Sequence, residues 1–264
     1  MSEPVAKPQF QPKSALLPPD SVPSQIAYGL SDMSICDERE PTPKSSNLCK
    51  KAGFATGSVN WHQQWALFAQ NFHHGKAHIS LAPYNSPHTL RLLPGPGFGD
   101  LSHPTTQLML SLMHPHIANQ PILDIGTGSG ILTLAALLLG ARSAIGIDID
   151  PSALTHARAN ARLNNLTPHF SLTLPKTLPP QNILLLNMIF PEQKIVNPPT
   201  LNPHAKLWIV SGILAEQKKA YLQQTEQWGW TPLSEHTKDG WMGWIFTCKL
   251  PQKTRRFSGA PTQM

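Results

Sequence analysis

The sequence is poor in residues that could crosslink it. Only three of its 264 residues are cysteines, Cys36, Cys49 and Cys248. The count is odd and no two have the C-x-x-C spacing, so neither a disulfide framework nor a metal site is indicated. The N-terminal stretch MSEPVAKPQFQPK also lacks the apolar region of a secretion signal. We therefore expect a protein of a reducing compartment, the cytoplasm.

Long hydrophobic runs and charged residues are scarce as well. The longest nearly apolar run, residues 131–141, is too short to span a bilayer and is typical of a buried helix, so we expect no membrane association. Charged residues make up only 14% of the chain, yet Lys and Arg outnumber Asp and Glu by 21 to 15. This surplus suits an acidic partner such as RNA or the ribosome, and it is equally typical of a mildly basic enzyme with a basic tail.

Proline, by contrast, is abundant, and it is concentrated near the N-terminus. Eight of the 27 prolines lie between Pro4 and Pro43, where no helix or strand period persists. We expect four segments, namely a disordered arm over residues 1–55, a linking segment over 56–104, the main domain over 105–250 and a basic tail over 251–264. The linking segment should hold a strand at residues 78–83 and, before it, a helix with aromatic residues at helical spacing, Trp61, Trp65, Phe68 and Phe72.

Strands and helices alternate through the main domain. Strands are expected at residues 121–125, 143–148, 169–174, 182–187 and 206–211, and helices at 105–113, 131–140, 151–165 and 215–229. Near the C-terminus, Asp239-Gly240 is a favoured hairpin turn between two further strands. The alternation predicts an α/β fold with a doubly wound, Rossmann-like sheet that gains an antiparallel hairpin strand at its edge.

Three glycines alternate after the first of these strands, in Asp124-Ile-Gly126-Thr-Gly128-Ser-Gly130. Glycine lets the backbone adopt a positive φ and touch a ligand. A dinucleotide fingerprint would need a further glycine in place of Ile131, and the carboxylate of Asp124 would repel a pyrophosphate. A ligand with an ammonium group and no phosphate fits better, and S-adenosylmethionine has that character.

A second acid supports this interpretation. Asp148 ends the next predicted strand, 24 residues after Asp124. A carboxylate at that place can accept hydrogen bonds from both ribose hydroxyls, as the acid of dinucleotide domains does. The alternative is an ordinary α/β turn with solvent-facing acids.

Several segments together resemble a known family. FGDLSHPTT, LDIGTGSGILTLAALLLGA, GIDIDPSALTHARANARLN, LLLNMIF and IVSGILAEQ occur in an order and spacing similar to those of the PrmA-type ribosomal-protein methyltransferases. The similarity runs from about residue 60 to 246. It implies a class I methyltransferase fold, S-adenosylmethionine as the cofactor, and methyl transfer to amino groups, chiefly of lysine, on the stalk-base protein of the large ribosomal subunit.

With the glycine loop, the resemblance assigns the cofactor to six residues, Thr106, Asp124, Gly126, Gly128, Asp148 and Asn187. The loop at Gly126 would contact the methionine part, Asp148 the ribose, and Thr106 would help to cover the cofactor. Asn187, at the end of the fourth strand, would lie beside the reactive methyl group and orient the target amine, which makes it the candidate catalytic residue. The alternatives are that Asn187 caps a strand end and that Thr106 is an ordinary residue of a first helical turn.

Two departures from the family keep other functions open. The family usually reads F-G-T-G-x-H-P-T-T, whereas Asp100 and Leu101 replace Thr-Gly here. The family's small substrate-gripping N-terminal domain has no visible counterpart in residues 1–55. A second interpretation is therefore a methyltransferase of the same fold that acts on another protein, a nucleic acid or a small molecule. A third is a degenerate cofactor-binding protein that associates with the ribosome.

Three further features receive structural interpretations. NPPT, at residues 197–200, resembles the N-P-P-[YF] motif of amino methyltransferases, but no good strand precedes it and Thr200 lacks the aromatic ring, so we expect a loop. His103 could act as a base, and a structural role before a helix is expected instead. Core and edge packing is expected for four tryptophans, Trp228, Trp230, Trp241 and Trp244.

Overall fold

The structure is a computed structural model, and it describes most of the chain, namely residues 61–68, 71–99, 103–178 and 180–248. All of these residues belong to one compact unit. The expectations for the arm over residues 1–55 and for the tail over 251–264 lie outside the described residues, as do Asp100 and Leu101.

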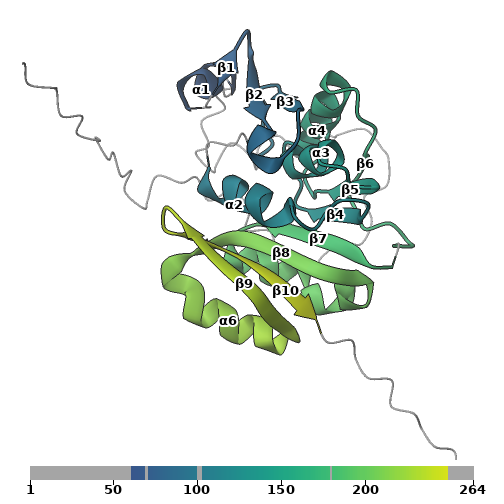
Figure 1. The fold of residues 1–264 in the computed structure, drawn as a ribbon, viewed down its shortest axis with the longest axis vertical. Helices are drawn as coiled ribbons and strands as arrows, with labels where there is room; N and C mark the ends of the chain where they lie inside the picture. The colour runs from purple at the N-terminus through teal and green to yellow at the C-terminus, as the bar shows by residue number, and fades with distance from the viewer. Residues whose placement is uncertain (1–60, 69–70, 100–102, 179, 249–264) are drawn as a thin grey trace, which may run out of the picture. The chain divides into compact units, whose positions relative to one another are not determined.

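A seven-stranded sheet forms the centre of this unit, in the order β6-β5-β4-β7-β8-β10-β9 (Figure 1). Its strands are β4 (Pro121–Ile125), β5 (Ser143–Ile147), β6 (His169–Ser171), β7 (Asn182–Asn187), β8 (Ala205–Leu214), β9 (Trp230–Lys238) and β10 (Trp241–Cys248). Neighbours from β6 to β8 run parallel, whereas β10 pairs antiparallel with both β8 and β9. The predicted doubly wound sheet with an antiparallel C-terminal hairpin is therefore confirmed.

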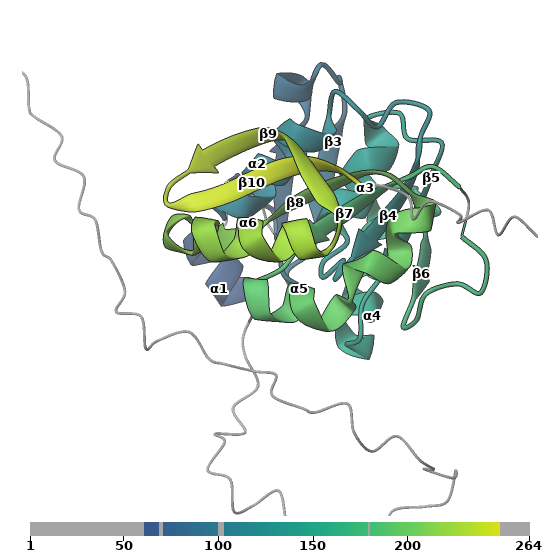
Figure 2. The same ribbon diagram turned by 90° about the horizontal axis from the view of Figure 1, so that it is seen from below.

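Helices cover both faces of this sheet. They are α2 (Pro104–Met113), α3 (Ile131–Leu138), α4 (Pro151–Leu163), α5 (Phe190–Val196) and α6 (Lys218–Gln227). Successive strand residues point to opposite faces, so Leu185 packs in one hydrophobic core with α2, α3 and α4, and Leu184 packs in a second core with α5 and α6. Figure 1 shows α2, α3 and α4 above the sheet and α6 below it. In Figure 2, α5 and α6 lie in front of the sheet. None of the described helices combines the length and apolarity that crossing a bilayer requires.

A small second sheet precedes the main one. It consists of β1 (Phe72–His73), β2 (Lys76–Ser80) and β3 (Thr89–Leu92), after helix α1 (Trp61–Phe68). Ile79 and Leu90 belong to the same core as α2. This core therefore includes residues on both sides of residue 104, where the linking segment was expected to end. The expected helix was too long, because the turn at His74-Gly75, with φ of 51° and 73°, folds Phe72 into a hairpin. The expected strand at 78–83 lies at 76–80, and β3 was not predicted.

The stretch around NPPT differs from a plain loop. Its preceding residues form α5, and residues 198–204 form a 3-10 helix, while β7 ends at Asn187 as predicted. Asn202 in this 3-10 helix is buried, and its Oδ1 accepts hydrogen bonds from the indole N–H groups of Trp208 at 3.0 Å and Trp230 at 2.9 Å. The segment therefore organises the tryptophan core, in which Trp228, Trp230 and Trp244 are buried as expected. The predicted strand at 169–174 is also shorter, since it ends at Ser171.

Candidate functional site

The predicted site residues gather at one edge of the main sheet. Strands β5, β4, β7 and β8 are parallel neighbours, so their carboxyl ends meet there. Asp124 lies at the end of β4, Asp148 directly follows β5, and Asn187 is the last residue of β7. The sequence prediction that these three side chains belong to one place agrees with the topology.

The start of α2 reaches the same edge. His103 caps this helix, with Nδ1 accepting from the backbone N–H of Thr105, and its ring packs edge-on against Trp241 at a centroid distance of 5.0 Å. Trp241 pairs with Leu214 at the carboxyl end of β8. These contacts give His103 the structural role that was expected, and they place Thr106, in the first turn of α2, at the carboxyl edge.

Asp124 is held inside the protein. It is 1% exposed, and its Oδ2 accepts hydrogen bonds from the hydroxyls of Thr127 and Thr133, each at 2.7 Å. Burial raises the pKa of this carboxyl to about 6, against the opposing effect of the two hydroxyls. The carboxylate thus ties the glycine loop to α3, and Oδ2 is already committed to that task.

The glycines lie where other segments approach the loop closely. Gly126 and Gly128 have φ of 73° and 54°. A Cβ at Gly126 would lie 2.9 Å from the sulfur of Met188, and one at Gly128 would lie 2.6 Å from the carbonyl oxygen of Phe98. At Gly128 the backbone of Phe98 requires glycine whether or not a ligand is bound, whereas at Gly126 the neighbour is a flexible side chain and the positive φ is what favours glycine.

Asp148, directly after β5, faces this loop. Its Oδ2 accepts from the backbone N–H of Gly128 at 2.9 Å, and its Oδ1 accepts from that of Asp150 at 3.0 Å. Each carboxylate oxygen keeps a further lone pair, and the residue is half-buried. Ile149, directly after it, is 74% exposed and offers an apolar surface beside the carboxylate. This arrangement fits a ligand that carries hydroxyl donors on an apolar body.

Two buried oxygen atoms at this edge have no partner among the described residues. They are Oγ1 of Thr106 and Oδ1 of Asn187. An unpaired buried polar atom costs about 1–3 kcal/mol, and a ligand that supplies a donor would remove that cost. Both oxygens can accept a hydrogen bond, which fits a ligand or substrate with amine or hydroxyl groups.

Sequence reasoning recognised the loop rich in Pro and Gly before α2 but missed the helix face that holds it. Residues 93–99 lie over the glycine loop, and the polar side chains of α4 fix them. His156 accepts from the N–H of Gly97 at 3.1 Å and contacts the carbonyl oxygen of Leu93 at 2.7 Å. Asn160 accepts from the N–H of Leu93 at 2.8 Å and donates to the carbonyl of Ser129 at 2.9 Å. The spacing of His156 and Asn160 by four residues on a buried helix face is the signal that could have revealed them.

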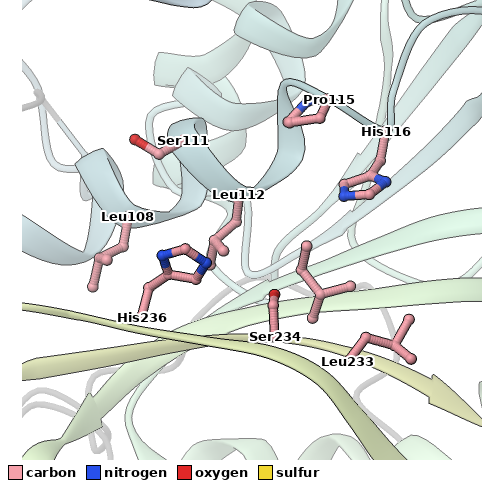
Figure 3. A pocket seen from close by; sticks show the side chains of 9 residues that line it. Leu108, Ser111, Leu112, Pro115, His116, Leu233, Ser234 and His236 are labelled. Carbon is pink, nitrogen blue, oxygen red and sulfur yellow. The ribbon is translucent and has the colours of Figure 1, made fainter.

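A groove of about 370 Å³ lies elsewhere, between α2 and β9 (Figure 3). Leu108 and Leu112 of α2 face Ser234 and His236 of β9 across it. None of the predicted site residues lines this groove. The candidate site is therefore the carboxyl edge of the sheet.

Comparison with solved structures agrees with this fold. The chain is similar to a ribosomal protein L11 methylase from Lactobacillus delbrueckii subsp. bulgaricus, with a TM-score of 0.55 and 28% identity over 61% of this chain and 86% of that one. A putative methyltransferase, SMU.776, whose crystal structure was solved with SAH, shares the fold, with a TM-score of 0.50 and 12% identity over 66% of this chain and 56% of that one. The sheet is therefore that of the class I methyltransferases.

Sequence comparison identifies the family. A ribosomal protein L11 methyltransferase from Azotobacter vinelandii is 40% identical over 169 residues, which are 61% of this chain and 57% of that protein. One from Pseudomonas paraeruginosa is 35% identical over 198 residues, 69% of this chain and 66% of that protein. The chain thus spans less than two thirds of the length of these relatives. The family model described as "Ribosomal protein L11 methyltransferase (PrmA)" matches residues 53–249, and the chain belongs to this family.

Proposed function

We propose that this protein is an S-adenosylmethionine-dependent methyltransferase that methylates lysine amino groups of the large-subunit ribosomal protein L11. The observation that carries the proposal is the pair of unpartnered buried oxygens on Thr106 and Asn187, at the edge where Asp148 presents its carboxylate. Relatives with this sequence pattern carry the name of that activity. A substrate of this class fits an enzyme of the cytoplasm.

The residues present fit the cofactor. Asp148 would accept the ribose hydroxyls with its free lone pairs, and Asp124 would add negative charge near the ammonium group. The glycine loop would contact the methionine part through its backbone. Thr106 would help to cover the cofactor and would accept a hydrogen bond from it through Oγ1. When bound, S-adenosylmethionine supplies an electrophilic methyl group.

The chain's remaining task is to present the amine. Only a neutral amine is a nucleophile, and a site shielded from water favours loss of the lysine proton. Asn187 Oδ1 then accepts one amine N–H, which directs the nitrogen lone pair toward the methyl group. Such alignment contributes about 7–11 kcal/mol to lowering a reaction barrier.

The proposal is tested with radiolabelled S-adenosylmethionine, the purified protein and unmethylated L11. Label on L11, abolished by Asn187→Ala at a cofactor concentration that still saturates the variant, is the expected result. No label on L11, with cofactor bound in a parallel calorimetric titration, would contradict the substrate. No binding in that titration would contradict the activity altogether and favour a degenerate family member.

A methyltransferase for another acceptor is the second candidate. The observation that favours it is the extent of the match, which comprises only 57% of the Azotobacter relative. In the same assay, label on a different ribosomal protein, on RNA or on a small molecule would favour this candidate.

A further inference from the structure

A buried glutamine joins three elements behind the candidate catalytic residue. Gln193 of α5 is fully buried. Its Nε2 donates to the carbonyl oxygens of Met188 at 2.7 Å and of Ser211 at 3.0 Å, and its Oε1 accepts from the Tyr221 hydroxyl at 2.7 Å. The side-chain amide is thus bonded on both of its ends.

The two carbonyls that accept from Gln193 belong to direct neighbours of Asn187. Met188 follows it in the chain, and Ser211 is its partner on the neighbouring strand β8. Gly212 has a φ of 94°, and a Cβ there would collide with the backbone of Met188, so this backbone lies directly against β8. The amide of Gln193 therefore bridges the exit of β7 to the strand beside it.

Tyr221 holds the oxygen end of the glutamine amide. It comes from α6, is fully buried, and burial raises its pKa well above the ordinary value. The hydroxyl therefore stays protonated. The carbonyls of Met188 and Ser211 can only accept, so they fix Nε2 on their side, and the hydroxyl donates to Oε1 on the other. A reversed amide would place its oxygen against carbonyl oxygens.

We propose that Gln193, held by Tyr221, is a positioning residue for the methyl transfer. It fixes the backbone of residues 187–189, and through it the direction in which Asn187 Oδ1 meets the amine. It does not touch the cofactor or the substrate. The inference rests on the proposed function, and its structural half can be tested without activity.

The test compares Gln193→Leu, Tyr221→Phe and a matched control, Thr225→Val. Thr225 is also buried in α6, and its hydroxyl bonds only within that helix, to the carbonyl of Leu222. We expect kcat to fall at least about tenfold in Gln193→Leu, and severalfold in Tyr221→Phe, while KM and cofactor affinity stay within about threefold. The control should keep kcat at equal thermal stability. Tyr221→Phe should have no further effect on kcat once Gln193 is Leu, because Tyr221 acts through it.

Equal kcat in all variants, or losses of kcat that follow the melting temperature in the control as well, would overturn the proposal. Hydrogen exchange gives the readout that is independent of activity. Faster exchange confined to residues 187–190 in Gln193→Leu, and absent from the control, supports the positioning role even if L11 is not the substrate. Unchanged exchange in this segment refutes the role, whatever the substrate is.

Discussion

At the scale of single residues, the two acids of the site have different surroundings and therefore different roles. Asp124 is enclosed and its Oδ2 is used by two threonine hydroxyls, whereas Asp148 is half-buried and is bonded only to backbone N–H groups. The enclosed acid mainly holds the glycine loop on α3. The open acid retains acceptor capacity for a ligand, so its loss should affect binding more than folding.

Asp148→Ala should weaken the binding of S-adenosylhomocysteine at least tenfold, or about 1.4 kcal/mol, because the acceptor for the ribose is lost. Isothermal titration calorimetry measures this. Asp150→Ala is the matched control, because Asp150 caps α4 through the N–H of Ser152, and its loss costs about 1 kcal/mol of stability without touching the ligand. Unchanged affinity in Asp148→Ala would show that the ribose lies elsewhere.

Asp124→Asn should change how stability depends on pH. The pKa of Asp124 is about 6 in the folded protein and 3.8 ordinarily, so the folded state binds more protons between these values. The stability that this carboxyl contributes is complete below about pH 4 and is lost as the pH rises through 6. The amide of the variant cannot ionise, so the variant should gain up to roughly 3 kcal/mol relative to the parent between about pH 4 and pH 8. Urea unfolding at several pH values measures the gain, and a pH-independent difference would contradict the assignment.

At the scale of elements, helix α4 acts as the support of the loop over the site. Gly97 N–H donates to Nδ1 of His156, so Nε2 carries the proton and donates to the carbonyl of Leu93. Burial lowers the pKa of His156, which agrees with a neutral ring. A protonated ring could no longer accept from Gly97, and the loop would lose one of its attachments.

His156→Leu should therefore destabilise the protein by about 1–3 kcal/mol near pH 8, because two backbone groups lose their partner. The folded pKa lies below the ordinary 6.5, so the unfolded state binds more protons and the parent loses stability as the pH falls through about 6.5. The difference in the free energy of unfolding between the parent and His156→Leu should accordingly become smaller in acid. Chemical unfolding of both proteins near pH 8 and pH 5.5 tests this, and a gap that widens in acid would contradict the neutral ring.

At the scale of the whole molecule, long periodic elements were predictable and short or polar ones were not. Strand β7 and its end at Asn187 followed from a run of apolar residues bounded by a polar one. Helix α5 was missed because its seven residues contain Pro191 and give too few turns for a period to show. The hydrogen bond between Gln193 and Tyr221 joins residues 28 apart, and those of His156 with the loop span 59 and 63, so no local pattern identifies the partners that these side chains bind.

The extent of the folding unit is testable by deletion. Within the described part of the chain, the buried residues of the two hydrophobic cores run from Trp65 to Phe246, so deleting residues 1–55 should leave the melting temperature within about 3 °C and cofactor affinity within about twofold. Deleting residues 1–80 is the control, because it removes Ala77 and Ile79 from the core and should lower the melting temperature by about 10 °C or more. Differential scanning calorimetry and a binding titration give both quantities. A loss of affinity in the shorter deletion would make the N-terminal residues part of the cofactor site, and a rise only in the KM for L11 would make them part of substrate recognition.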